Sequence, residues 1–392
     1  MPSLDFRFRT AAALLQECLR GYPIVAITGP RQSGKSTLLA HELAGWSQVS
    51  LEDPDIRAFA REDPRGFLAR HQAPLVIDEA QHAPELFSYL QTVVDRGGAT
   101  GRYVLSGSQN LMLSAHIAQS LAGRVALIEL LPFSAAELGL AALEATSLDQ
   151  ALVQGSFPAV HSRSLAPARY YANYVATYLE RDVRQLTQVQ DLLVFQRFLR
   201  LAAGRIGQLL NFSALAADAG ISQPTAAAWI AVLEASYVVR RVAPFHRNFG
   251  KRLVKAPKLY FLDTGLAAWL LGIDSPQTMS SHVMRGPLFE NWVVMDAVKH
   301  RAHHGDARPV YFWRDNIGTE VDLVLEDAGG LTGIEIKSGQ TLAGDMVRHL
   351  QTWQRHIGTQ EASRPVLIYG GEGSFERWQV PVLGWRELAR SH

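Results

Sequence analysis

One short motif constrains this chain more than any other feature. Gly29 to Ser36 reads Gly-Pro-Arg-Gln-Ser-Gly-Lys-Ser and matches the pattern G-x-x-x-x-G-K-[ST]. The apolar run Ile24 to Thr28 before it is typical of a strand, and a helical pattern follows from Ser36. A loop of this kind at a helix start presents converging backbone N–H groups to phosphate oxygens. The motif therefore predicts a phosphate-binding loop for a nucleoside triphosphate such as ATP.

Individual residues of the motif have expected roles. Lys35 is expected to reach the β- and γ-phosphates, and the Ser36 hydroxyl to bind Mg²⁺. The predicted nucleotide contacts are Gly29, Pro30, Arg31, Gln32, Ser33, Gly34, Lys35, Ser36 and Thr37, together with Ser108 from a later strand end. A chance glycine-rich turn is the alternative, and the full match between a strand and a helix argues against it.

Two acids follow a second apolar run. Leu75 to Ile77 predicts a strand that ends in Asp78 and Glu79. At the carboxyl edge of a parallel sheet, Asp78 can hold the Mg²⁺ shell and Glu79 can polarise a water in line with the γ-phosphate. Acids commonly end strands, so the run alone is a weak signal. In combination with the loop it favours a catalytic role.

Two further candidates lie between residues 104 and 130. The strand-like run from Val104 ends in polar residues, and Ser108 among them suits sensing of the γ-phosphate, although turn residues that simply end a strand are the alternative. Arg124 precedes the apolar run Val125 to Leu130. It is a candidate for stabilising transition-state charge, in cis or in trans, against the alternative of a surface ion pair.

Composition limits the class of protein. The chain has 392 residues, enough for several domains, and a formal net charge of +1, so a nucleic-acid contact requires a local basic patch. The lone Cys18 excludes an internal disulfide and a cysteine-based zinc site. The charged N-terminal segment does not resemble a signal peptide, and no apolar run is long enough to span a bilayer. We therefore expect a soluble cytoplasmic protein that does not contact membranes.

The middle of the chain predicts a helix-turn-helix with a basic segment after it. Two helical stretches meet at Gly220, and Ser222 is a natural N-cap for the second. Between residues 240 and 258 there are seven Lys or Arg and no acid, which would place positive charge in a wing against DNA phosphates. The candidate DNA contacts are Arg240, Arg241, Arg247, Lys251 and Arg252. The alternative is a packing module, because the second helix is largely apolar.

Four charged residues of the C-terminal part are expected to converge. Glu335 and Lys337 share one face of a strand, Asp322 lies on the preceding strand, and Glu290 comes from a helix. Carboxylates of this kind can ligate one or two Mg²⁺ or Mn²⁺ ions, with Lys337 orienting the attacking water of a phosphodiesterase. An exposed hairpin with ordinary surface acids is the alternative.

Taken together, these segments resemble a family of bacterial and archaeal AAA-type ATPases with a winged helix and a C-terminal domain similar to PD-(D/E)xK nucleases. The resemblance rests on GPRQSGKST, LVIDEAQ, VLSGS, SLAGR, YLERDV, YFLDTGLAAWL, GPLFENWV, EVDLVL and IEIKSG, which span nearly the whole chain. It implies ATP and Mg²⁺ binding at Gly29 to Thr37 and Asp78, hydrolysis at Glu79, and a phosphate-sensing role for Arg124. It also matches the nuclease pattern at Glu290, Asp322, Glu335 and Lys337.

The expected fold class is α/β, with three domains. They are a parallel-sheet P-loop domain at residues 1–160, a helical and winged-helix domain at 161–280 and an α/β restriction-endonuclease-like domain at 281–392. The leading hypothesis is an ATPase whose nucleotide state controls a DNA-binding and DNA-cleaving C-terminal half. The rival is an ATP-driven switch, acting alone or as an oligomer on protein partners, in which the nuclease-like domain is an inactive scaffold.

Overall fold

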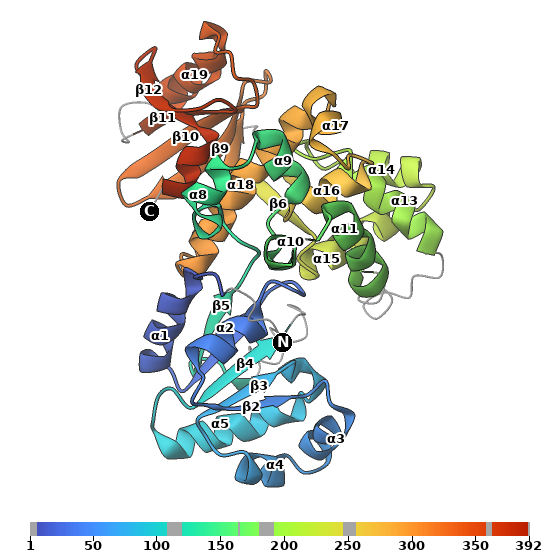
Figure 1. Cartoon of the computed structure of the whole chain (residues 1–392), viewed down its shortest axis with the longest axis vertical. Coiled ribbons are helices and arrows are strands. Elements are labelled where there is room, and N and C mark those ends of the chain that lie inside the picture. Colours follow the sequence, from blue (N-terminus) through green and yellow to red (C-terminus); the bar gives the residue numbers. More distant parts are fainter. Residues whose placement is uncertain are drawn as a thin grey trace. The chain divides into compact units, whose positions relative to one another are not determined.

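The computed structural model describes residues 6–107, 120–163, 165–179, 192–245, 256–357 and 363–390 (Figure 1). Its contacts divide the chain into two compact units. Unit 1 comprises Met1–Pro132 and Arg301–Ala307, and unit 2 comprises Phe133–His300 and Arg308–His392. The middle and C-terminal thirds of the chain thus share one unit, and the three-domain division remains a prediction.

Unit 1 is built on a five-stranded parallel sheet in the order β2-β3-β4-β1-β5. The strands are β1 (Ile24–Thr28), β2 (Ser47–Ser50), β3 (Leu75–Asp78), β4 (Tyr103–Gly107) and β5 (Val125–Glu129). The connecting helices are α1 (Ala11–Gly21), α2 (Lys35–Glu42), α3 (Pro54–Glu62), α4 (Pro64–Arg70), the 3-10 turn η1 (Ala80–His82) and α5 (Glu85–Gly97). This arrangement confirms the predicted parallel α/β domain.

Both faces of this sheet are covered, as the apolar strands predict. All of β1 is buried, and its residues alternate between two cores. Val25 and Ile27 join the core formed with α1 and α2, whereas Ile24 and Ala26 join the core formed with α3, α4 and α5. The loops that follow β1 and β3 lie at the carboxyl edge of the sheet and carry polar side chains.

Unit 2 contains an eight-stranded mixed sheet in the order β12-β13-β11-β10-β9-β8-β6-β7. Its strands are β6 (Val239–Pro244), β7 (Lys258–Phe261), β8 (Tyr311–Arg314), β9 (Glu320–Asp327), β10 (Gly330–Lys337), β11 (Ser363–Tyr369), β12 (Ser374–Arg377) and β13 (Val380–Gly384). β6, which carries two of the arginines expected in a wing, belongs to this sheet together with β7, because it pairs with β7 and in parallel with β8.

Unit 2 also contains many helices. They include α7 (Ala135–Leu138), α8 (Leu140–Glu144), α9 (Leu148–Gln154), α10 (Pro158–Ser162), α11 (Pro167–Tyr174), the π-helix η2 (Val175–Leu179), α13 (Leu192–Ala203), α14 (Phe212–Ala219) and α15 (Gln223–Ala235). They continue with α16 (Thr264–Leu270), α17 (Pro276–Ser281), α18 (Arg285–His303), η3 (Gly344–Val347), α19 (Arg348–Ile357) and η4 (Trp385–Arg390). In the part of the chain that is described, no helix combines the length and apolar character needed to cross a membrane.

The expected helix-turn-helix is formed by α14 and α15. Gly220 ends α14 in the left-handed conformation with φ +71°, a backbone state that glycine adopts without strain. Ser222 caps α15 by accepting a hydrogen bond from the backbone N–H of Thr225 at 3.2 Å. Ala226, Trp229 and other apolar residues of α15 are buried, so this helix is committed largely to packing.

Helix α18 carries residues of both units. Its final residues, from Arg301, are grouped with unit 1, and the remainder is grouped with unit 2. Within unit 2, Asn291 on this helix is fully buried and exchanges hydrogen bonds with the backbone of Phe261, accepting from N–H at 2.7 Å and donating to C=O at 2.8 Å. These bonds satisfy backbone groups on β7, the edge strand of the sheet.

Candidate nucleotide-binding site and C-terminal ion network

The loop between β1 and α2 requires glycine at two positions. Gly29 has φ +148°, and a Cβ there would lie 2.1 Å from the carbonyl oxygen of Leu130. Gly34, directly before α2, has φ +96°. The predicted residues Pro30, Arg31, Gln32 and Ser33 lie between these glycines, and Thr37 lies in the first turn of α2. The chain thus forms the strand, loop and helix that the motif predicts.

Lys35 folds over this loop. It is 6% exposed, and its Nζ donates to the carbonyl oxygens of Gly29 and Pro30, both at 2.9 Å. These contacts keep the ammonium group beside the backbone that would cradle a phosphate. A lysine amine in this position can exchange carbonyl contacts for phosphate oxygens.

Ser36 and Asp78 meet at the carboxyl edge of the sheet. The Ser36 hydroxyl donates to Asp78 Oδ2 at 3.0 Å, and the Ser106 hydroxyl of β4 donates to Asp78 Oδ1. A hydroxyl and a carboxylate are oxygen ligands of the kind that Mg²⁺ prefers, so the pair fits a Mg²⁺ ion that bridges to phosphates. Sequence reasoning singled out Ser108, which lies outside the described residues, and missed Ser106. The strand pairing of β3 with β4 is what brings Ser106 to Asp78.

Glu79 is held in a defined position. Its backbone is left-handed, with φ +54°, and only 9% of the residue is exposed. The side-chain amide of Gln81, itself 3% exposed, donates to Glu79 Oε2. A fixed carboxylate one residue beyond Asp78, the predicted Mg²⁺ ligand, is suited to orient an attacking water. Gln81 was not predicted, since only the fold shows that its side chain turns back to Glu79.

A buried arginine outside the motif donates a hydrogen bond to the phosphate-binding loop. Arg9 is 3% exposed, and its guanidinium donates to the carbonyl oxygens of Ser33 at 2.7 Å and Leu131 at 2.6 Å. The backbone N–H of Leu131 in turn donates to Nε2 of His303 at 3.1 Å. Arg9 therefore links the phosphate-binding loop to the segment after β5, and that segment contacts the end of α18 within unit 1.

Arg124 is not brought to the loop of its own chain. It immediately precedes β5, and Val125 pairs with Ile24 at the start of β1, whereas the loop follows the end of β1. Parallel strands place these two positions at opposite edges of the sheet. The guanidinium binds Asp95 of α5 through two hydrogen bonds of 2.6 and 3.0 Å. The structure thus gives no support to an action in cis, and an action in trans remains a prediction.

The four predicted C-terminal residues do converge. Lys337 Nζ lies 2.5 Å from Glu335 Oε1 and 3.8 Å from Asp322 Oδ2, and the backbone N–H of Ile336 donates to Asp322 at 2.8 Å. The fourth member, Glu290, shares the ammonium group of Lys258 with Glu320, which lies two residues before Asp322 on β9.

A second lysine, which the sequence analysis assigned to the basic stretch, belongs to this network. Lys258 on β7 is 2% exposed and forms ion pairs with Glu290 at 2.9 Å and Glu320 at 2.5 Å. The hydroxyl of Tyr260 also donates to Glu290, at 2.6 Å. Burial lowers the pKa of Lys258, but the surrounding carboxylates, Glu290 first among them, outweigh burial and raise it.

Crowding of carboxylates affects their protonation. Burial, reinforced by the negative charge of Asp322, raises the pKa of Glu335 to about 8 and that of Glu290 to about 7. The positive charge of Lys337 partly offsets this rise at Glu335, and that of Lys258 does so at Glu290. Burial and crowding thus disfavour the ionised forms of Glu290 and Glu335, whereas Lys258 and Lys337 favour them.

Lysines contact two of the predicted metal ligands. Among the described residues, no group of three or more His, Cys, Asp and Glu side chains is arranged to hold a metal ion. Lys258 and Lys337 lie against the oxygens of Glu290 and Glu335 that a metal would need. The predicted ligands Glu290, Asp322 and Glu335 thus form an ion network with Lys258 and Lys337, and their role as metal ligands remains a prediction.

Of the predicted DNA contacts, only two can be placed. Arg241 is exposed and pairs with Glu234 of α15, with Nη2 2.6 Å from Oε2, while Arg240 next to it is half-buried. Arg247, Lys251 and Arg252 lie outside the described residues. The burial of Lys258 removes one charge from the basic stretch, because its ammonium group faces carboxylates.

Unit 1 has the parallel sheet and the phosphate-binding loop of a P-loop NTPase-like domain. Residues 21–139 match the family described as AAA domain. Residues 145–277 and 285–388 match two families described as domains of unknown function, DUF8612 and DUF4143.

The chain is also similar to two mycobacterial proteins along most of its length. They are the uncharacterized protein Mb2031c of Mycobacterium bovis and the uncharacterized protein Rv2008c of Mycobacterium tuberculosis. Each is 33% identical over 371 residues, which cover 94% of this chain and 81% of the relative. The chain belongs to the family of these proteins.

Solved structures show weaker similarity. The Walker-type ATPase paby2304 of Pyrococcus abyssi has a TM-score of 0.45 and 14% identity, covering 66% of this chain and 94% of that one. A RuvB variant of Thermotoga maritima has a TM-score of 0.31 and 18% identity, covering 59% of this chain and 87% of that one. With scores this low, the fold assignment rests on the parallel sheet and the AAA family match.

Proposed function

We propose that the protein binds ATP with Mg²⁺ and hydrolyses it to ADP and phosphate. The observation that carries this proposal is the convergence of Lys35, Ser36, Asp78 and Glu79 at the carboxyl edge of one parallel sheet. Bound Mg²⁺ would neutralise phosphate charge. Lys35 binds the β- and γ-phosphates, Ser36 and Asp78 hold the ion, and Glu79 orients the attacking water while Gln81 fixes its carboxylate.

Phosphate release by the purified full chain tests this proposal. Lys35→Ala should lose both nucleotide binding and hydrolysis, whereas Glu79→Gln should bind ATP and hydrolyse it at least about 100-fold more slowly. Magnesium-dependent hydrolysis that persists in both variants would come from a contaminant. A wild-type protein that releases no phosphate under any tested condition would refute the ATPase proposal.

The nucleotide state is transmitted to unit 2 through α18. Arg9 contacts the phosphate-binding loop and Leu131, Leu131 contacts His303, and α18 continues from His303 to the ion-network residue Glu290. Hydrogen exchange of α18 peptides with and without ATPγS tests this route. We expect an ATPγS-dependent change in residues 285–300 that disappears in His303→Ala while ATPγS binding persists. An unchanged response in that variant would refute the route.

Unit 2 acts on DNA in the leading hypothesis, through a winged-helix arrangement of α14, α15 and the β6–β7 strands. The support is the order of these elements and the arginines on β6. Because α15 exposes few side chains that could read bases, contacts to the phosphate backbone are favoured over base reading. Stimulation of the ATPase by DNA supports this hypothesis. Stimulation by a protein partner and not by DNA favours the rival switch.

DNA cleavage is a second candidate function, favoured by the convergence of Asp322, Glu335 and Lys337. Plasmid cleavage with Mg²⁺ or Mn²⁺ that is lost in Asp322→Ala and Lys337→Ala would support the candidate. Equal cleavage by both variants would indicate contamination, and no cleavage by the wild type would favour the inactive scaffold.

A further inference from the structure

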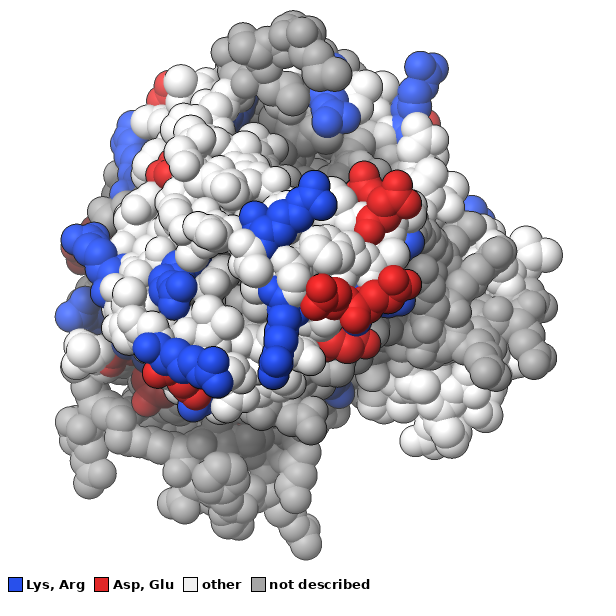
Figure 2. All heavy atoms as spheres, turned by 90° about the horizontal axis from the view of Figure 1, so that it is seen from below, with Lys and Arg blue, Asp and Glu red and all other residues white. Residues whose placement is uncertain are grey.

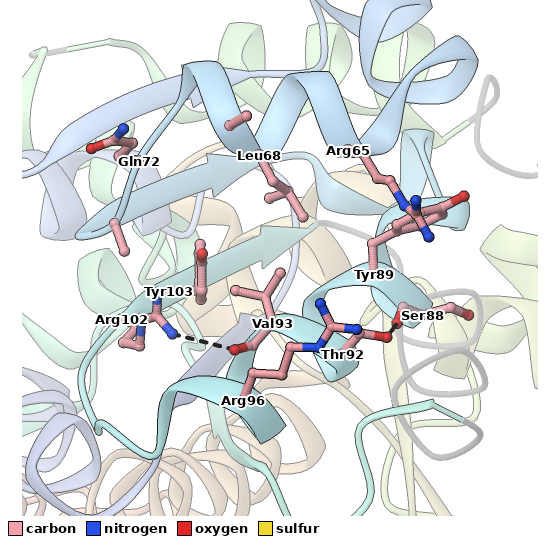
Figure 3. Close-up of a pocket in the computed structure, with 12 residues that line it drawn as sticks. Arg65, Leu68, Gln72, Ser88, Tyr89, Thr92, Val93, Arg96, Arg102 and Tyr103 are labelled. Carbon is pink, nitrogen blue, oxygen red and sulfur yellow. Dashed lines mark hydrogen bonds between the residues drawn. The ribbon is translucent and has the colours of Figure 1, made fainter.

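Unit 1 has a groove of about 840 Å³ between α4, α5 and the residue before β4 (Figure 3). Leu68 and Val93 contribute apolar surface to it. Arg65, Arg96 and Arg102 also line it, and Figure 3 shows Arg65 and Arg102 with Val93 between them in this view. The groove therefore combines an apolar lining with guanidinium groups from three separate segments.

The positive charge of the groove is not balanced within the chain as described. No Asp or Glu lines the groove, and no described carboxylate forms an ion pair with Arg65, Arg96 or Arg102. By contrast, Arg124 on the same unit pairs with Asp95. Figure 2 shows the molecule from below, with basic side chains over the middle of that face and acidic side chains mainly to one side. Arginines that share a groove with no acid create a site of positive potential for an anion.

Two of the arginines are oriented by contacts that leave donors available. The guanidinium of Arg65 lies over the ring of Tyr89, 5.8 Å from its centroid. Arg102 donates one long hydrogen bond of 3.4 Å to the carbonyl oxygen of Val93, near the end of α5. A guanidinium has five N–H donors in a planar fork, so each retains donors that can bind a phosphate through two hydrogen bonds.

The groove is separate from the ATP site. Arg102 directly precedes β4 and Ala73 lies just before β3, so the groove lies at the amino edge of the sheet. Lys35 and Asp78 lie at the carboxyl edge, one strand length away. Phosphates of an ATP molecule held by Lys35 cannot reach these arginines, and the groove requires a different ligand.

We propose that this groove binds the phosphate groups of a single-stranded nucleic acid. Its polar lining consists of arginines together with Gln72, Ser88, Thr92 and Tyr89, the side-chain types that donate to nucleic-acid phosphates. Its aromatic and apolar surface suits the unstacked bases of a single strand. An acidic peptide carries no bases to fill that surface. Binding here does not depend on ATP hydrolysis.

Fluorescence polarisation with a labelled oligo-dT of about 20 nucleotides tests the proposal. The full chain is titrated at about 50 and about 200 mM salt. We expect Arg65→Ala with Arg96→Ala to weaken binding at least about tenfold and to reduce the salt slope by about 1.4, since each phosphate contact on a single strand contributes about 0.7. The matched control is Arg70→Ala, an exposed arginine at the end of α4 that does not line the groove.

Two further measurements separate the alternatives. Lys35→Ala should bind the oligonucleotide as the wild type does, so a failure of the ATPase proposal leaves this one intact. Equal binding by the wild type and the double variant would overturn the proposal and leave the middle of the chain as the DNA-binding region. Displacement of the oligonucleotide by polyglutamate as readily as by unlabelled DNA would also overturn it, in favour of an acidic protein partner.

Discussion

The guanidinium of Arg9 donates a 2.7 Å hydrogen bond to the carbonyl oxygen of Ser33, inside the phosphate-binding loop. Both residues are buried, and the same guanidinium also donates to Leu131. The conformation of a loop that binds phosphate through its backbone thus depends on a side chain from a segment that precedes α1.

Replacement of this arginine should weaken nucleotide binding. In Arg9→Ala the carbonyl oxygens of Ser33 and Leu131 lose a buried donor, at a cost of roughly 1 to 3 kcal/mol, or about 5- to 150-fold in ATP affinity if the cost falls on the bound state. Titration with a fluorescent ATP analogue measures this change. The matched control is Arg20→Ala, an exposed arginine that bonds only to the backbone of its own helix. Equal affinities of both variants would show that Arg9 does not position the loop.

Arg124 allows a test of action between subunits. Because the strand register places it far from the loop of its own chain, Arg124→Ala should retain ATP binding and lose hydrolysis only if the residue completes a neighbour's site. Mixing Arg124→Ala with Lys35→Ala should then recover activity that neither variant has alone, since one variant keeps the loop and the other keeps the arginine. Full activity of Arg124→Ala by itself would mean that Arg124 takes no part in hydrolysis and serves only in its ion pair with Asp95.

The sequence predicted the local parts of the site well and the long-range parts poorly. Lys35, Ser36, Asp78 and Glu79 are found where the motifs place them, because each motif sets its own backbone. Arg9 has no such signal, since a single arginine near the N-terminus does not reveal that it will pack under a loop after β1.

The same limit explains the errors in the second half of the chain. Lys258 was grouped with the neighbouring basic residues, although its partners Glu290 and Glu320 lie far along the sequence. The place of β6 and β7 in the larger sheet was missed for a similar reason. The parallel pairing of β6 with β8 joins segments that are distant in sequence, and alternation within each strand does not specify its partner.

Lys258 should be essential for the stability of unit 2. In Lys258→Met, Glu290 and Glu320 lose a fully buried counter-charge, and breaking such a pair costs about 3 to 5 kcal/mol. Urea unfolding followed by circular dichroism measures the loss. Lys337→Met is the matched control, because its side chain is 35% exposed against 2% for Lys258, and its loss should be clearly smaller. A double variant with Glu290→Gln should recover part of the stability.

Asp296 gives a pH dependence whose sign can be stated. This residue of α18 is buried and accepts a 2.6 Å hydrogen bond from the backbone N–H of Ala135. Burial is the main cause that raises its pKa from 3.8 to about 6. Between these values the folded protein binds the proton and the unfolded chain does not, so unfolding releases a proton and stability falls as the pH rises.

Asp296→Asn should remove that slope. Asparagine keeps the acceptor for Ala135 but does not ionise, so between pH 4 and pH 7 the variant should lose less stability than the wild type, by about 2 kcal/mol. Urea unfolding of both proteins at the two pH values measures the difference, and other titrating groups cancel because they are common to both. Parallel pH profiles of the two proteins would mean that Asp296 ionises in the folded state as it does in the unfolded chain.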